Sequence, residues 1–78
     1  MNWRDHIHSD PGILGGKPVI RGTRISVELV LEYLADGGSV ADVSAAYPHV
    51  REDDVRAVLA FAHDMVVDED RIARQRAA

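Results

Sequence analysis

The chain has 78 residues, no cysteine and a formal net charge of −4. A chain of this length forms one small domain that hides only about 60% of its unfolded surface, so a single copy is marginally stable. The lack of cysteine excludes disulfides and thiolate metal sites as a remedy. Hydrophobic residues make up 46% of the chain, which argues against disorder throughout. We therefore expect oligomerisation, in the form of a homodimer.

The sequence contains no export or membrane signal that we can identify. No apolar run approaches the ~18 residues that a membrane-spanning helix needs. The first ten residues, MNWRDHIHSD, lack the basic-then-apolar layout of a signal peptide. The expected location is the cytoplasm, and no membrane partner is expected.

Charge is unevenly distributed along the chain. Residues 1–26 contain four basic and two acidic side chains, whereas residues 27–70 contain two basic and eleven acidic ones. Residues 71–78 add three arginines and no carboxylate. This distribution indicates either two surfaces of opposite character or simply solvated faces, and the sequence leaves both interpretations open.

Residues 1–25 are expected to form an arm of short strands and turns. Proline and glycine recur in Asp10-Pro11-Gly12, Gly15-Gly16, Lys17-Pro18 and Gly22. Their spacing excludes a long helix and favours short extended pieces joined by turns. We expect strands near residues 5–8 and 18–21, paired either within the chain or across a dimer. Their apolar anchors are Ile7, Val19, Ile20 and Ile25.

Two short helices are predicted after the arm. The first follows Ser26, a good N-cap, and ends at Gly37-Gly38. Its buried face repeats at three and four residues and comprises Val27, Val30, Leu31 and Leu34. The second follows Ser39, with Asp42 in the position of a capping box, and ends at Pro48. Its buried face comprises Val40, Val43 and Tyr47.

A third helix is predicted from Arg51 or Glu52 onward. Glu52, Asp53 and Asp54 crowd its first turn, where the helix dipole favours carboxylates. Its expected buried stripe comprises Val55, Val58, Leu59, Ala62 and Met65 or Val66, and Ile72 could extend it.

The predicted fold is mainly α. A strand-and-turn arm at residues 1–25 belongs to the same domain as a three-helix core at 26–66, and a C-terminal helical tail follows at 67–78. The short second helix meets the third through Pro48-His49-Val50, which is the arrangement of a helix-turn-helix unit. Any small three-helix bundle would show the same pattern, so it is weak evidence of DNA binding on its own.

The run from Gly12 to Pro18 is similar to a phosphate-binding loop but fails two requirements. A Walker loop needs glycine at the position of Pro11, five residues before Gly16. It also needs serine or threonine after the lysine, to supply a magnesium ligand, and Pro18 stands there. We therefore reject nucleotide binding by this loop.

Histidines and carboxylates give no convincing catalytic or metal site. His6 and His8 alternate onto one face of the proposed strand, a spacing compatible with two metal ligands, but a zinc site needs more. We interpret them as surface histidines. His63-Asp64 and the run Asp68–Asp70 could suggest a magnesium-dependent nuclease, yet consecutive helical carboxylates point in different directions. We therefore expect no enzyme activity, no catalytic residue, no metal site and no cofactor.

The segment from Gly16 to Val27 is the most informative part of the chain. Arg21 and Arg24 flank Gly-Thr just before a capped helix. Arginine forks and a small hydroxyl side chain suit contacts with phosphates or carboxylates. The arginines could equally pair with carboxylates of this acidic domain. The candidate DNA-binding residues are Lys17, Arg21, Thr23, Arg24 and, at the start of the third helix, Arg51.

Over roughly residues 7–62 the chain resembles the domain-of-unknown-function family 433. The signals are Asp10-Pro11, Gly16-Lys17-Pro18, Arg21-Gly22-Thr23-Arg24, Val27, Gly37, Tyr47-Pro48 and Asp54-Val55. The resemblance implies a homeodomain-like helix-turn-helix fold and a VapB-like antitoxin role. Such an antitoxin neutralises a PIN-type ribonuclease toxin and represses the shared operon by binding operator DNA. A free-standing dimeric transcription regulator and an assembly module are the alternatives.

One departure from the family pattern affects the expected DNA contacts. Members usually have serine or threonine before the third helix, where this chain has Arg51. Arg51 adds a cation there, but the adjacent Glu52–Asp54 run faces phosphates poorly. We therefore expect the basic arm to carry most of the DNA contacts.

The tail provides the hypothesis for binding the toxin. It ends in Arg71, Arg74 and Arg76 after an acidic run. PIN-type nucleases hold magnesium in a cluster of carboxylates, so arginines inserted there would block metal and substrate together. These three residues are the candidate toxin-binding residues.

Overall fold

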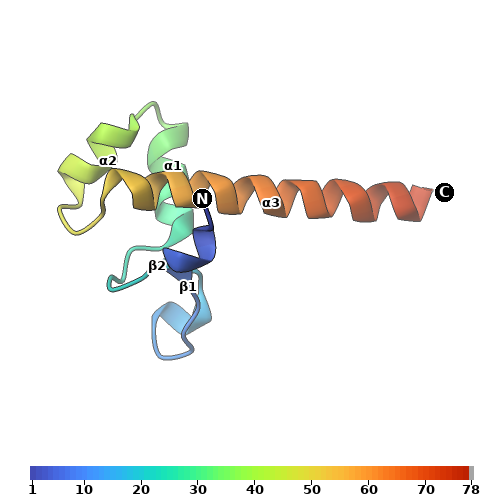
Figure 1. The fold of residues 1–78 in the computed structure, drawn as a ribbon, viewed down its shortest axis with the longest axis horizontal. Helices are drawn as coiled ribbons and strands as arrows, with labels where there is room; N and C mark the ends of the chain where they lie inside the picture. Colours follow the sequence, from blue (N-terminus) through green and yellow to red (C-terminus); the bar gives the residue numbers. More distant parts are fainter. Residues whose placement is uncertain (78) are drawn as a thin grey trace.

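The structure, a computed structural model, describes residues 1–77. It is mainly helical, with a short two-stranded arm at the N-terminus, as predicted from the sequence (Figure 1). The elements are, in chain order, a 3-10 turn η1 (Trp3–Asp5), strand β1 (Ile7–His8), a 3-10 turn η2 (Leu14–Gly16), strand β2 (Val19–Ile20), and helices α1 (Val27–Ala35), α2 (Val40–Ala46) and α3 (Glu52–Ala77).

The arm closes on itself within the chain. Strands β1 and β2 pair antiparallel, with Ile7 opposite Ile20 and His8 opposite Val19. The sequence left pairing across a dimer open, and the structure shows the intrachain alternative. Ile7, Val19 and Ile20 are all buried, so the arm contributes to the same core as the helices.

The starts of α1 and α2 follow their capping residues. The Ser26 hydroxyl accepts a hydrogen bond from the Leu29 amide at 3.0 Å. Ser39 and Asp42 form the complete capping box that their spacing predicts, each side chain accepting from the other's backbone amide. Gly37 follows α1 with a φ of 103°, a conformation that favours glycine. Both helices therefore begin and end where local sequence signals predict.

The core consists almost entirely of small branched side chains. The fully buried residues from the helices and the turn before α3 are Val30, Val43, Val50, Val55, Ala57 and Val58. Leu31, Leu34, Val40 and Tyr47 are only partly buried and pack around them. Because no large side chain is fully enclosed apart from Ile20, the core is narrow, and it covers only a short length of α3.

The predicted buried stripe of α3 is confirmed at Val55 and Val58, and Ala62 is partly buried, but the prediction is wrong at Leu59 and beyond Ala62. Leu59 is 44% exposed, because it lies one residue, or about 100°, around the helix from the buried Val58. Met65, Val66 and Ile72 are 41%, 67% and 41% exposed. They continue the apolar period of Val55 and Val58, but the small core ends before they are reached.

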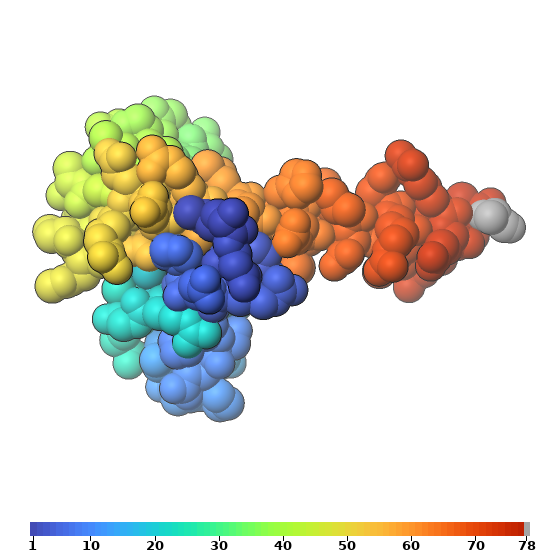
Figure 2. Space-filling model, viewed as in Figure 1, coloured from blue at the N-terminus to red at the C-terminus, as the bar shows by residue number. Residues whose placement is uncertain are grey.

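Helix α3 therefore outruns the rest of the molecule. Asp64 is the last of its side chains with a contact to the arm, and every residue from 65 to 77 is exposed. We call residues 65–77 the α3 extension; Figures 1 and 2 show it projecting from one side of the body. At 1.5 Å per residue it is about 20 Å long. The helical tail is thus present, while Ala78, its last predicted residue, lies outside the described residues.

Candidate functional site: the basic turn and the α3 extension

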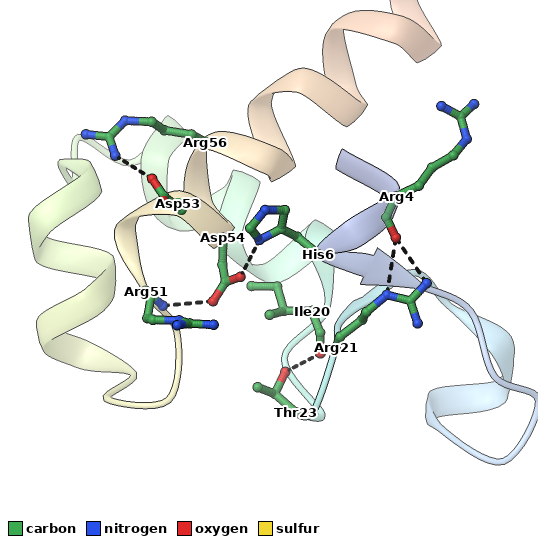
Figure 3. A network of polar contacts seen from close by, with 9 residues as sticks. All are labelled: Arg4, His6, Ile20, Arg21, Thr23, Arg51, Asp53, Asp54 and Arg56. Atoms are coloured by element: carbon green, nitrogen blue, oxygen red, sulfur yellow. Dashed lines mark hydrogen bonds and ion pairs between the residues drawn. The ribbon is translucent and has the colours of Figure 1, made fainter. Parts of the chain in front are cut away.

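The arm is fixed to α3 by a buried carboxylate (Figure 3). Asp54 is only 7% exposed, and its Oδ1 lies 2.9 Å from the His6 Nδ1 atom. Its second oxygen accepts the backbone N–H of Arg51 at 2.9 Å, which ties the turn before α3 to the helix. The surface interpretation of His6 is wrong, because its side chain is only 25% exposed and is bound to Asp54.

A second contact fixes the beginning of the arm. The Trp3 indole Nε1 donates to Asp64 Oδ2 at 2.8 Å, and its ring packs edge-on against Phe61 with centroids 4.8 Å apart. This hydrogen bond, with a smaller contribution from His63, lowers the pKa of the Asp64 carboxyl below its usual value of 3.8. Neither this contact nor the His6–Asp54 contact is predictable from spacing, since the partners lie 61 and 48 residues apart.

Two of the predicted DNA-binding residues are engaged within the arm itself. The Arg21 guanidinium donates twice to the Arg4 carbonyl, at 3.2 and 3.0 Å (Figure 3). The Thr23 hydroxyl donates to the Ile20 carbonyl at 2.8 Å and accepts the Ile25 amide at 3.0 Å. Thr23 therefore shapes the turn between β2 and α1, and Arg21 ties this turn to η1.

The remaining predicted cations differ in whether another residue already binds their charged groups. Lys17 pairs with Glu28 at 3.0 Å, but both side chains are more than half exposed, so the pair is weak. Arg24 and Arg51 are exposed, and within residues 1–77 no hydrogen bond or ion pair engages their guanidinium groups. Arg24 and Arg51 are thus the two arginines of the predicted set whose guanidinium groups have no partner among residues 1–77.

The fold brings the turn between β2 and α1 (residues 21–26), which we call the basic turn, beside the turn between α2 and α3. Residues 22–25 and 46–49 line one shallow hollow of about 230 Å³, with Arg24 from the first segment and His49 from the second. Arg51 follows His49 by two residues. The arm and the supposed helix-turn-helix region therefore form one continuous surface rather than two separate ones.

The first turn of α3 is acidic, as predicted, and the nearest arginine within the helix, Arg56, is paired with two of its carboxylates. Arg56 lies 3.6 Å from Glu52 and 3.2 Å from Asp53. These exposed pairs neutralise part of the acidic turn but leave its net charge negative. Just before the helix, Arg51 adds a cation that has no partner among the residues that the structure describes.

The α3 extension presents the candidate toxin-binding arginines on a solvated helix. Arg71 lies 3.7 Å from Asp68 and Arg74 lies 3.1 Å from Asp70, and the two arginine side chains are 66% and 80% exposed. Arg76 is exposed and is the last residue but one of α3. Exposed apolar side chains accompany them, namely Met65, Val66, Val67 and Ile72.

Within the described residues 1–77, no three histidine or acidic side chains come together in a group that could hold a metal ion. The two possible metal ligands His6 and His8 have different surroundings. His6 binds Asp54, whereas His8 lines a second hollow together with Ile13 and residues 22–24. Nor is any helix of that part of the chain long and apolar enough to cross a membrane.

The sequence profile of the family described as "Protein of unknown function (DUF433)" matches residues 7–62. The chain belongs to the DUF433 family. A crystal structure of a DUF433 member from Anabaena variabilis superposes with a TM-score of 0.73 at 28% identity, covering 96% of this chain and 71% of that one. The uncharacterized protein y4eO of Sinorhizobium fredii is 31% identical across a gapped alignment of 90 positions that covers 94% of this chain. Only 41% of that relative is covered.

The family match stops just before the extension begins. It covers the arm, the basic turn, α1, α2 and the docked part of α3 up to residue 62. The family signals that the sequence displayed, such as Arg21-Gly22-Thr23-Arg24, fall on the turn that Thr23 and Arg21 hold together. Part of this signature therefore serves turn geometry, and Arg24 is its arginine without a hydrogen bond or ion pair to residues 1–77.

Proposed function

We propose that this chain is a cytoplasmic antitoxin of a type II toxin–antitoxin system. It acts by stoichiometric binding to a PIN-type ribonuclease toxin and catalyses no reaction itself. The observation that carries the proposal is the α3 extension, thirteen helical residues that are all exposed. A solvated helix that bears a methionine, two valines and an isoleucine is the usual form of a segment that binds a groove on a partner.

The charges of the extension suit a carboxylate-rich nuclease site. Arg71 and Arg74 hold only exposed ion pairs within the helix, and such pairs contribute little, so they exchange easily for partner carboxylates. Arg76 adds a third guanidinium close to the end of the helix. In a magnesium site built from carboxylates, these arginines would take the place of the metal and block substrate.

Operator binding is the associated activity that we propose for the other end of the molecule. Arg24 and Arg51 are the exposed arginines without a partner there, and the hollow between residues 22–25 and 46–49 joins their two turns. Arginines that flank a shared surface can contact phosphates of one DNA backbone. The acidic first turn of α3 makes deep insertion of this helix unfavourable, so the contacts come mainly from the two turns.

Co-expression with the nuclease encoded beside this chain tests the antitoxin proposal. The wild-type protein should co-purify with the nuclease and suppress RNA cleavage. Arg71→Glu/Arg74→Glu/Arg76→Glu should weaken inhibition by tens- to thousands-fold, since losing one partner of a buried charge pair costs roughly 2–5 kcal/mol. Deletion of residues 68–78 should have the same effect.

Arg56→Glu is the matched control, because it reverses an exposed arginine on the docked part of α3. It should inhibit like the wild type. Full inhibition by the triple variant would place the inhibitory contacts in the core instead. A wild-type protein that neither binds nor inhibits the nuclease would reject the antitoxin role.

Operator DNA binding is tested separately, by its dependence on salt. Arg24→Ala and Arg51→Ala should each reduce the salt slope by about one phosphate contact. Arg21→Ala and Lys17→Ala should change it less, because these side chains are engaged within the protein. Equal binding by wild type and an Arg24→Ala/Arg51→Ala variant would reject this surface.

A further inference from the structure

Apolar side chains continue along one face of α3 from the core into the extension, where Glu69 interrupts them. Met65, Ile72 and Ala73 follow Val58 by seven, fourteen and fifteen residues, which places them on the same side of the helix, with Glu69 between them. Val58 is fully buried, whereas Met65 and Ile72 are each 41% exposed. The face that holds α3 to its own core is thus left uncovered over the outer half of the helix.

The charges of this outer half are divided into two blocks. Residues 64–70 contain four carboxylates and no cation, and residues 71–77 contain three arginines and no carboxylate. If two copies of the extension lay side by side and antiparallel, the basic block of each would face the acidic block of the other. A parallel alignment would instead place acid beside acid and arginine beside arginine.

The overall shape favours the antiparallel alignment as well. The extension leaves the body from one side, so a second helix can lie along it without meeting the arm or α1 (Figure 2). The chain has a net charge of −4. Antiparallel overlap of the extensions alone keeps the two acidic bodies at opposite ends, whereas parallel overlap would bring them together.

We infer that the α3 extension is a self-association surface, on which two copies of this chain pair antiparallel through Met65, Ile72 and Ala73. The contact is isologous, so a single patch supplies both halves of a closed dimer. It is also small, and the dimer therefore forms in the micromolar range rather than below it. This inference does not depend on the nuclease partner, although a nuclease bound to the extension would displace the second copy.

A charge-swap experiment on the full-length chain tests the pairing. Arg71→Glu/Arg74→Glu/Arg76→Glu gives an acidic extension, and Asp68→Lys/Glu69→Lys/Asp70→Lys gives a basic one. By sedimentation equilibrium at about 100 μM, the wild type should have about twice the chain mass and each variant alone should have the chain mass. An equimolar mixture of the two variants should return to twice the chain mass. The Arg71→Lys/Arg74→Lys/Arg76→Lys control should dimerise like the wild type.

Orientation is tested with a cysteine, which the native chain lacks. Oxidised Ala77→Cys should form no disulfide dimer, because antiparallel pairing holds the two helix ends far apart. Folding of every variant is checked by circular dichroism and by the fluorescence of Trp3. A wild-type monomer at 100 μM, self-association of either charge variant alone, or a monomeric mixture would overturn the proposal. Rapid disulfide formation by Ala77→Cys would overturn the antiparallel alignment.

Discussion

The two halves of α3 have the same apolar period but different surroundings. In the first half, Val55 and Val58 are completely buried, and Asp54 and Asp64 hold the N-terminal arm against the helix. In the second half, Val66 is 67% exposed and no residue from 65 to 77 is covered by the rest of the chain. A hydrophobic period therefore indicates that a face will be covered, but not by which partner. In the first half the partner is the chain's own core.

The largest contrast between the halves is expected from introducing a charge. Val58→Asp should destabilise the fold by about 3 kcal/mol or more, because it buries an unpaired carboxylate, and a chain of this size should then unfold. Val66→Asp should change the free energy of unfolding by less than about 0.5 kcal/mol. Urea denaturation at low micromolar concentration measures both. Equal losses would mean that the extension is part of the cooperative core.

A smaller contrast is expected between two neighbouring carboxylates. Asp54→Ala should cost about 1–3 kcal/mol, since it leaves His6 and the Arg51 amide without their partner. Asp53→Ala should cost no more than about 0.5 kcal/mol, because Asp53 has only an exposed pair with Arg56. Urea denaturation measures the loss of unfolding free energy in both variants. Similar losses in the two would contradict a structural role of Asp54.

Glycine substitutions compare the halves at the level of the backbone. Ala57→Gly should lower the free energy of unfolding by about 1 kcal/mol, because Ala57 is a buried interior residue of the helix. Ala73→Gly should reduce the helical circular dichroism signal without moving the unfolding midpoint, since it affects only the solvated end. A shift of the midpoint by Ala73→Gly would contradict the division of α3 at Asp64.

Acidification should act on the boundary between the halves. The Trp3 hydrogen bond lowers the pKa of Asp64 below 3.8, so its stabilising contribution is present above that value and is lost as pH falls through the lower, folded value. The fluorescence of Trp3, the only tryptophan, should therefore change below about pH 4. In Asp64→Asn this change should be absent. An identical transition in both proteins would assign it to another group.

Local signals predicted much of the fold. The start of α1 was predicted from Ser26, its end from Gly37, and the start of α2 from Ser39 with Asp42. These signals are predictable because caps and stops act over a few residues. The strands also lie within their predicted ranges. The contacts of His6 and Trp3 with α3 were not predictable, since tertiary packing alone brings such distant residues together. The error over Met65, Val66 and Ile72 has a similar origin, because periodicity does not reveal where a core ends.

The sequence identified the basic residues of the candidate site, but it did not show which of their side chains are already hydrogen-bonded or ion-paired within the protein. Arg21, Thr23, Arg24 and Arg51 lie on or beside two adjoining turns and Lys17 lies before β2, but only the fold shows which of these side chains already have a partner. Arg21 donates to a backbone carbonyl and Thr23 to another, so their residue types were explained equally well by turn structure. Arg24 and Arg51 keep the proposed role in binding DNA.

Hydrogen exchange along α3 tests most directly whether one half of this helix holds the fold and the other binds partners. At low micromolar concentration, amides in the region 56–64 should be strongly protected, and those in the extension should exchange within seconds. Addition of the neighbouring nuclease should protect the extension and leave the first half unchanged. Uniform protection of the whole helix in the free protein, or a complex in which the extension still exchanges rapidly, would contradict this account.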